Sequence, residues 1–340
     1  MAAVLCLGEA LIDRLGPLGG EPTADPSLCE DHLGGAPANA ACALARLGTP
    51  SAFVGRLGCD AIGTAFGQLF AARGVDQGGL QWDQQRPSRI VLVRRDAAGE
   101  RVFGGFAGDR GAGFADQALE AQPWSAAHGP LLAQARWLLL GTIPLASSAS
   151  AEAAWLAVAQ AKAAGVAIAL DVNWRPTFWN PEADPASGPS PEQRQPMLAL
   201  LQHAQLIKCA AEEAQWLFDT SDPRTISAAL SARPLVVVSD GARPVRWGWA
   251  DGPVGSLQPF AVTVVDSTGA GDAFSAGLLH RLCCGSPTRT PGLEGLDPTA
   301  LAEHMRFASA CGALVCQGAG AIDPQPSVAQ VQAFLQAHRQ

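Results

Sequence analysis

The sequence of 340 residues has no tyrosine, no apolar run long enough to span a membrane, and comparatively little positive charge. Its 31 acidic residues outnumber its 23 lysines and arginines, and the net charge of −8 argues against nucleic acid as the main partner. The opening residues, Met1–Leu5, contain no basic segment of the kind that starts a secretory signal peptide. These absences predict a globular protein that binds neither membrane nor nucleic acid. Phosphate ligands stay open, because a few local donors can hold them.

The cysteines and histidines lack the spacings that metal and disulfide sites use. The nine cysteines are an odd number, and no two form a Cys-x-x-Cys pair. The six histidines show no metal-binding spacing, and none neighbours a candidate nucleophile. We therefore expect buried, reduced thiols and a cytoplasmic location.

Short apolar strands alternate with helical segments along most of the chain, which is 48% hydrophobic. Such alternation predicts an α/β fold with a largely parallel sheet and right-handed crossovers. Two β-rich segments, residues 89–93 and 101–106, stand outside this alternation, and Ala97-Ala98-Gly99 between them is typical of a hairpin turn. Together with residues 14–33, the hairpin predicts a small β lid over the site. The expected core comprises residues 1–13, 34–87 and 108–340, and the expected lid comprises residues 14–33 and 88–107.

The stretch Asp266-Ser267-Thr268-Gly269-Ala270-Gly271-Asp272-Ala273-Phe274 places small residues between two carboxylates, directly before a helical apolar pattern. A turn of this kind leaves backbone N–H groups free at the positive end of the helix dipole, which makes an anion site. A carboxylate at Asp272 would repel an anion unless it acts on a neighbouring hydroxyl group. The alternative is an ordinary glycine-rich loop in which Asp272 is a first-turn helix residue.

Other polar residues follow predicted strands, and in a parallel sheet those strand ends share one edge. The residues concerned are Asp13, Asp171, Asn173, Arg175, Lys208, Ser239 and Asp272. Asn39 follows a pair of glycines and suits a polyol ligand; the alternative is a polar residue at a helix start. Phosphoryl transfer to an alcohol needs such a set, namely a base for the hydroxyl and fixed donors for the moving phosphoryl group. No Walker-type phosphate loop is present, which argues against a P-loop ATPase.

These motifs resemble the two signatures of the ribokinase-like (PfkB) carbohydrate kinases. Residues 266–274 are similar to the C-terminal signature, and Gly34-Gly35-Ala36-Pro37-Ala38-Asn39-Ala40-Ala41 is similar to the N-terminal one, about 230 residues earlier. The resemblance covers essentially the whole chain, including Gly8-Glu9, Gly55–Gly58, Asp171–Pro176 and Gly318–Ala321. It implies a three-layer α/β/α core with a β lid, ATP with Mg²⁺ as donor, and a sugar as acceptor. It also leaves room for a homodimer formed through the lid.

The resemblance implies a role for each matching residue. Asp272 would be the base, and the N–H groups of Gly269, Ala270 and Gly271 would form the anion hole. Sugar hydroxyls would be bound by Asp13, Gly34, Gly35, Asn39 and Asp272, with Arg175 reaching the phosphates or the substrate. The nucleotide site would comprise Lys208, Ser239, Gly241, Gly269, Gly271 and Ser309. Glu213 would support Mg²⁺ through water, and a potassium-like ion would lie near Asp266, Thr268, Val315 and Gly320.

Two departures from the family pattern bear on Mg²⁺ and ATP binding, and the lid residues bear on the sugar. Ala210 stands where relatives often carry asparagine, and Pro244 stands where a glycine is common. Phe103 and Gly105 occupy the lid where relatives selective for acidic keto-sugars tend to place tyrosine and arginine. The fructokinase branch is the best match, so we expect phosphorylation of fructose at its 6-hydroxyl. Ribokinase, 2-keto-3-deoxygluconate kinase, nucleoside kinase and a non-catalytic sugar-binding relative stay as alternatives.

Overall fold

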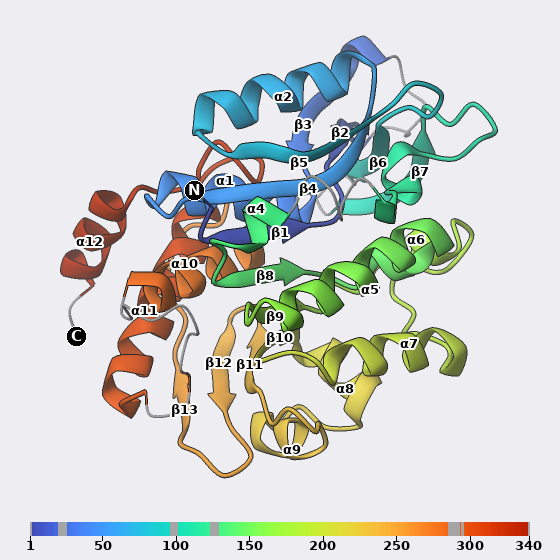
Figure 1. The fold of residues 1–340 in the computed structure, drawn as a ribbon. Helices are drawn as coiled ribbons and strands as arrows, with labels where there is room; N and C mark the ends of the chain where they lie inside the picture. Colours follow the sequence, from blue (N-terminus) through green and yellow to red (C-terminus); the bar gives the residue numbers. More distant parts are fainter. Residues whose placement is uncertain are drawn as a thin grey trace.

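Two β-sheets organise the chain in the computed structural model, which describes residues 2–19, 26–95, 101–122, 129–284, 293 and 296–338 (Figure 1). The larger sheet has nine strands, in the order β13 (Val254–Leu257), β12 (Arg243–Gly248), β11 (Leu235–Asp240), β10 (Leu206–Ala210), β9 (Ala167–Asp171), β8 (Trp137–Leu140), β1 (Val4–Leu7), β4 (Ser51–Gly58) and β5 (Asp76–Asp83). The strands from β11 to β5 are parallel to their neighbours, as predicted. The antiparallel strands β12 and β13 extend one edge, and the alternation of strands and helices gave no sign of them.

Helices cover both faces of the large sheet, which makes the predicted three layers. One face packs against α5 (Ser148–Ala163), α7 (Pro191–Leu201), α8 (Ala211–Phe218) and α9 (Pro223–Ala228). The other packs against α1 (Ala36–Arg46), α2 (Ala61–Arg73), α10 (Ala270–Cys284) and α11 (Pro298–Val315). The remaining helices are α4 (Gly129–Leu132), α6 (Pro176–Trp179) and α12 (Val328–Ala337), with short 3₁₀ turns η1 (Pro26–Leu28), η2 (Ala115–Ala118) and η3 (Ile143–Ala146).

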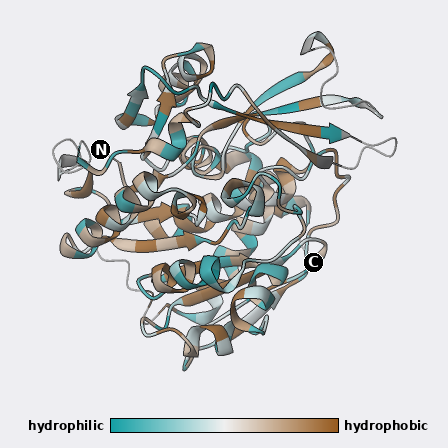
Figure 2. Ribbon diagram, turned by 90° about the vertical axis from the view of Figure 1, so that its right-hand side faces the viewer, coloured by the Kyte–Doolittle hydropathy of each residue, from teal (hydrophilic) through white to brown (hydrophobic). Residues whose placement is uncertain are grey.

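The apolar runs of the central strands are explained by burial on both faces. In β1, Leu5 and Leu7 belong to the core beneath α5, whereas Val4 and Cys6 belong to the core beneath α1 and α10. Successive strand residues point to opposite faces, so a strand covered on both sides must be apolar throughout. Figure 2 shows these hydrophobic strands between the helix layers.

The smaller sheet has the strand order β3-β2-β6-β7, formed by β3 (Glu30–Gly34), β2 (Leu11–Leu18), β6 (Arg89–Arg95) and β7 (Arg101–Ala107). β6 and β7 pair antiparallel, which confirms the predicted hairpin, while its turn at residues 97–99 lies outside the described residues. β2 begins at Leu11, three residues before the lid was expected to start. Asp13 therefore lies within a strand of the small sheet, and the prediction that it ends a strand of the main sheet is wrong.

The cysteines in the structure are all free, and four of them are buried: Cys6, Cys42, Cys209 and Cys311. Cys59 and Cys284 are exposed, so the prediction of buried thiols is correct for only some of the cysteines. Within the described residues, no helix combines the length and the apolar character needed to cross a membrane.

Candidate active site

The loop before α10 presents the start of this helix to a cavity. Gly269 has a φ of +76°, and a Cβ added there would lie 2.5 Å from the Cβ of Ala321, so the turn requires glycine. First-turn N–H groups have no partner within their own helix. The Ala270 N–H donates to the Ser267 carbonyl at 3.2 Å, which corrects the prediction that all three N–H groups are open. In the described part of the chain, the N–H groups of Gly269 and Gly271 donate to no other residue.

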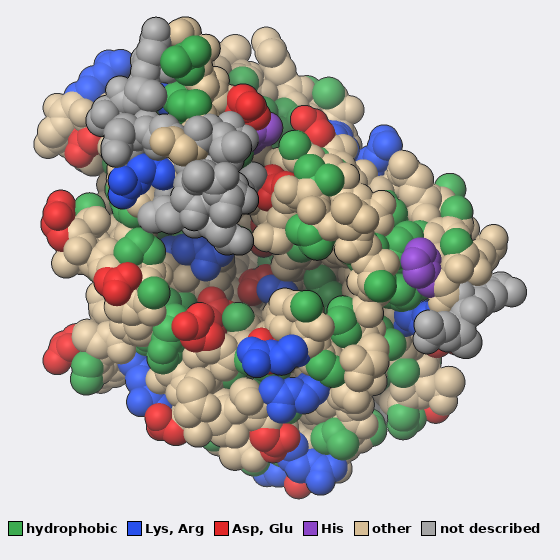
Figure 3. All heavy atoms as spheres, turned by 180° about the vertical axis from the view of Figure 1, so that it is seen from behind, with side chains coloured by type: hydrophobic (Ala, Val, Ile, Leu, Met, Phe, Trp, Pro, Cys, Tyr) green, Lys and Arg blue, Asp and Glu red, His purple; other side chains and the backbone are tan. Residues whose placement is uncertain are grey.

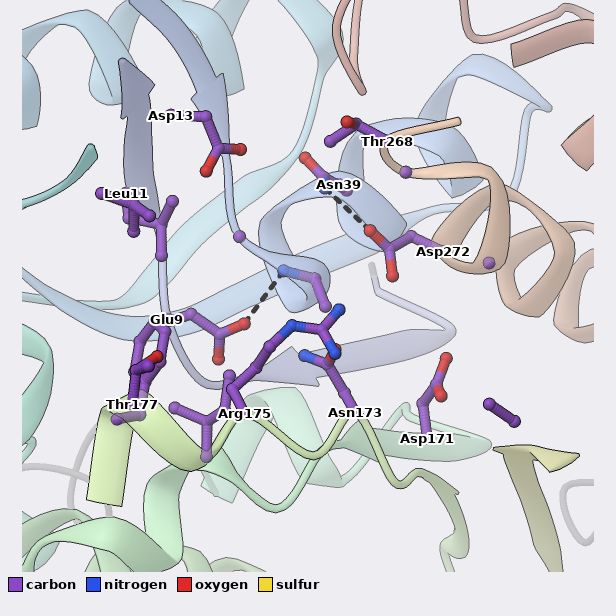
Figure 4. Close-up of a pocket in the computed structure, with 18 of the residues that line it drawn as sticks. Glu9, Leu11, Asp13, Asn39, Asp171, Asn173, Arg175, Thr177, Thr268 and Asp272 are labelled. Carbon is purple, nitrogen blue, oxygen red and sulfur yellow. Dashed lines mark hydrogen bonds between the residues drawn. The ribbon is translucent and has the colours of Figure 1, made fainter. Parts of the chain in front are cut away.

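Asp272 lies in the first turn of α10, and Asn39 on α1 fixes its position. The Asn39 Nδ2 donates to Asp272 Oδ2 at 2.8 Å, a bond drawn in Figure 4. Burial and the nearby negative charge of Asp171 raise the pKa of Asp272 to about 6, while Asn39, Lys208 and Arg175 act in the opposite direction. A carboxylate with this pKa is ionised at neutral pH and is more basic than an ordinary aspartate, which suits a general base.

A cavity of about 600 Å³ opens beside Asp272 and is lined by most of the predicted sugar-binding residues. Asp13, Arg175 and Asp272 point into it from three sides (Figure 4). Gly35 and Asn39 also line it, whereas Gly34 does not. A Cβ on Gly34 would lie 2.7 Å from Asp13 Oδ2, so Gly34 acts by making room for the Asp13 carboxylate.

Asn39 carries an unused acceptor at this cavity. The residue is 3% exposed, and its Oδ1 has no hydrogen-bond partner among the described residues. A buried acceptor without a partner is costly, so a ligand hydroxyl is a natural partner. Gln325, which the sequence did not single out, donates its Nε2 to the carbonyls of Asn39 at 2.9 Å and Ala321 at 3.1 Å. It thereby ties α1 to the loop packed under Gly269.

Two carboxylates that sequence reasoning left without a role also line the cavity. Glu9, just after β1, accepts a bond from the Ala36 N–H at 3.0 Å, and burial raises the pKa of Glu9 to about 8. Asp171 ends β9 and accepts from Lys208 Nζ at 3.0 and 2.8 Å. Their positions after buried strands were the available signal, but the spacing did not reveal their partners.

A second cavity, of about 670 Å³, lies on the other side of the α10 N-terminus. Its lining includes the predicted nucleotide residues Lys208, Ser239, Gly241, Gly271 and Ser309, whereas Gly269 lines only the first cavity. Apolar side chains such as Phe260, Val262 and Val264 complete the wall. The two cavities share Lys208, Ser239, Ser267 and Gly271. Figure 3 shows one face of the molecule hollowed near its centre, with acidic and basic side chains inside.

Glu213 fits a metal only through water. Its Oε1 accepts from the Trp174 N–H and its Oε2 from the Ala210 N–H, both at 2.7 Å, and burial raises its pKa. Each oxygen keeps one lone pair that could hold a metal-bound water. Among the described residues, no group of three or more His, Cys, Asp or Glu side chains could hold a metal ion. A magnesium ion here would be held mainly by nucleotide phosphates.

Asp266 joins the two loops expected to hold a monovalent cation. Its Oδ1 accepts from the Thr268 N–H at 2.9 Å, and its Oδ2 accepts from the Gly320 N–H at 2.8 Å. The Val315 carbonyl accepts from the Gly318 N–H at 3.2 Å and keeps a second lone pair. Carboxylate and carbonyl oxygens are the donors that hard cations prefer, so this set fits such an ion.

The sheet, the two joined cavities and the carboxylate at the α10 start define a ribokinase-like α/β protein. The chain aligns with the structure of a fructokinase with bound ATP from Xylella fastidiosa, with a TM-score of 0.85, 28% identity and 99% of each chain covered. A family model described as "pfkB family carbohydrate kinase" matches residues 1–328, and the protein belongs to this family of sugar kinases.

Two further relatives are fructokinases by name. The chain is 32% identical over 344 aligned residues to the probable fructokinase-7 of Arabidopsis thaliana, covering 99% of this chain and 93% of that protein. It also aligns with a double mutant of the Vibrio cholerae O395 fructokinase, solved in a fructose, ADP and potassium ion bound form. That alignment has a TM-score of 0.79 and 28% identity, and it covers 98% of each chain.

Proposed function

We propose that the protein transfers the γ-phosphoryl group of ATP to the 6-hydroxyl of D-fructose, giving ADP and D-fructose 6-phosphate. The observation that carries this proposal is the position of Asp272, which lines the first cavity directly after Gly271, a residue that both cavities share at a helix start with open N–H groups. One cavity suits a polyol and the other a nucleotide. The relatives that bind ATP, or fructose with ADP, support the same assignment.

In the proposed reaction, Asp272 accepts the proton of the fructose 6-hydroxyl. The oxygen then forms its bond to the γ-phosphorus while the bond from that phosphorus to the ADP oxygen breaks. The N–H groups of Gly269 and Gly271, together with the Lys208 ammonium, stabilise charge on the phosphoryl oxygens. Arg175 reaches the same region from the loop before α6.

Ions complete the proposed site. Mg²⁺ bound to the phosphates, supported by Glu213 through water, would neutralise negative charge during transfer. A potassium-like ion held by Asp266 and the carbonyls of Thr268, Val315 and Gly320 would add positive charge beside the anion hole. Within this chain, Asp266 already fixes the loop geometry through its bonds to Thr268 and Gly320.

The lining of the sugar cavity favours a neutral polyol. Its lid side is formed by the apolar side chains of Leu11, Val91, Val93 and Phe103, together with the carboxylate of Asp13. Among the described residues lining the cavity, the cations are Arg175 and Lys208, and Lys208 is paired with Asp171. A carboxylate or phosphate at the lid end of a sugar would therefore meet no cation among these residues, so fructose is favoured over acidic or phosphorylated sugars.

The test is ADP release from purified protein with fructose, ribose, 2-keto-3-deoxygluconate and a nucleoside. We expect kcat/KM for fructose to exceed every other value by at least about tenfold, the ratio that 1.4 kcal/mol of preference gives. The Asp272→Asn variant, prepared in the same way, controls for contaminating kinases. A rate with ribose or the acidic keto-sugar and none with fructose would overturn the proposed substrate.

A further inference from the structure

Asp171 lies at the end of β9 with both carboxylate oxygens engaged. Oδ1 accepts from Lys208 Nζ at 3.0 Å, and Oδ2 accepts from the same Nζ at 2.8 Å. Oδ2 also accepts from the Ser275 Oγ at 3.0 Å. A carboxylate held in this way is poorly placed to bind a sugar or take a proton.

Lys208 lies where the two cavities join. It lines both of them, and a Cβ on Gly271 would lie 3.1 Å from its Nζ, so the ammonium lies against the first turn of α10. An ammonium has three N–H donors, and Asp171 takes two. Among the described residues, no other acceptor is bonded to this ammonium, so its third N–H is available to a ligand at the junction.

Without Asp171 the ammonium would have no fixed position. A lysine side chain has a flexible four-carbon stem and a strongly hydrated head, so it does not stay at one point unless something holds it. Ser275 lies one turn after Asp272 on α10, and its bond to Asp171 ties the ion pair to the helix that carries Asp272. The distance from the ammonium to the anion hole is thus set by Asp171.

We propose that Asp171 is a positioning residue, which holds the Lys208 ammonium at the junction of the two cavities so that its third N–H contacts the transferred phosphoryl group. The inference rests on the proposed kinase function and adds a role that Asp171 performs through Lys208. Asp171 neither binds the sugar nor acts as the base.

A double-mutant cycle tests the role. Asp171→Asn, Lys208→Met and the double variant are compared for kcat with fructose and ATP. Each single change should lower kcat by about 10²-fold, the cost of one lost transition-state donor, and the double variant should be no slower than Lys208→Met. Multiplied losses in the double variant would overturn the proposal, as would a higher KM for fructose with kcat unchanged.

The pH profile gives a readout that a merely structural role would not move. The charged and polar groups facing Asp272 are Asp171, Lys208, Arg175, Asn39 and, from the segment after β1, Glu9. Removing the negative charge of Asp171 lowers the pKa of Asp272, so the acid limb of kcat/KM should move to lower pH in Asp171→Asn. An unmoved limb contradicts the geometry proposed. Asp251→Asn, in the exposed pair with Arg233, is the matched control and should leave the profile unchanged.

Two further measurements keep the proposal testable if Asp171→Asn does not fold or if the proposed kinase activity is absent. If Asp171→Asn does not fold, Ser275→Ala removes one bond to Asp171, and it should lower kcat in the same direction by less. If the wild type turns over no sugar, the proposed function fails while the inference is still tested by calorimetry. Asp171→Asn should then weaken ATP binding but not AMP binding, and this difference should vanish in the Lys208→Met background. Equal losses for ATP and AMP would overturn it.

Discussion

Asp266 and Asp272 flank the same glycine-rich turn, and their surroundings give them different chemistry. Both oxygens of Asp266 accept backbone N–H groups from Thr268 and Gly320, so this carboxylate closes the loop. Asp272 accepts one bond, from Asn39, and otherwise faces the cavity. The residue with an open oxygen beside the helix start is the one suited to proton transfer.

Asp272→Asn keeps the size of the side chain and removes its basicity. We expect kcat to fall by about 10²- to 10⁴-fold, the usual contribution of a general base, because the fructose hydroxyl then keeps its proton. Binding of ADP should stay within about twofold of the wild type, since the nucleotide cavity is unchanged. Rapid-mixing kinetics and calorimetry measure the two quantities, and full turnover in the variant would remove Asp272 as the base.

The acid limb of kcat/KM reports the ionisation of Asp272. Because the base must be ionised, activity should rise as pH increases through about 6, the pKa that burial gives this carboxyl, and level off above it. The Asn39 hydrogen bond lowers this pKa, so Asn39→Ala should move the limb to higher pH. Asn39→Asp would be a poor control because it adds charge. A limb that stays in place in Asn39→Ala would show that another group titrates.

At the scale of elements, a buried ion pair joins the small sheet to the 3₁₀ turn η2. Arg89 on β6 and Asp116 on η2 are 3% and 6% exposed and pair through two bonds of 2.8 and 3.0 Å. The Arg89 guanidinium also lies 4.4 to 4.7 Å from the ring centres of Phe106, Phe114 and Phe178. Phe178 belongs to α6, which follows Arg175, so this cluster connects the lid to the segment that carries Arg175.

Breaking that pair should cost far more than breaking an exposed one in the same sheet. Asp116→Asn leaves Arg89 buried without its partner, and we expect a loss of about 3–5 kcal/mol in the free energy of unfolding. Asp31→Asn breaks the more exposed pair with Arg14 and should cost no more than about 1 kcal/mol. Urea unfolding monitored by circular dichroism compares the two variants. Equal losses would mean that Asp116 contributes no more than a surface charge.

At the scale of the whole molecule, the parallel part of the fold could be predicted because burial on both faces makes its strands uniformly apolar. The strands β12 and β13 could not, because both mix polar and apolar residues and so lack the uniformly apolar character of the central strands. The convergence of Asn39 and Asp272 was also predictable from the two signature motifs, whereas Asp13 reaches the same cavity from within a strand of the small sheet.

Other features of the site depend on contacts between distant segments, and the spacing of residues along the sequence does not predict these contacts. The pairing of Lys208 with Asp171, and the bonds from Gln325 to α1, join residues far apart in the sequence. The Ala270 N–H is taken by a local turn bond, which motif matching does not detect. Glu213 was expected beside a metal, yet its oxygens also hold the backbone at Ala210 and Trp174.

The most direct test of the proposed mechanism is a crystal structure with fructose and a non-hydrolysable ATP analogue bound together. We expect the fructose O6 at about 2.6–3.2 Å from an Asp272 carboxylate oxygen, with the γ-phosphate at the N-terminus of α10. A sugar whose O6 lies beyond hydrogen-bond reach of Asp272, with another side chain in that place, would contradict the assignment of Asp272 as the base.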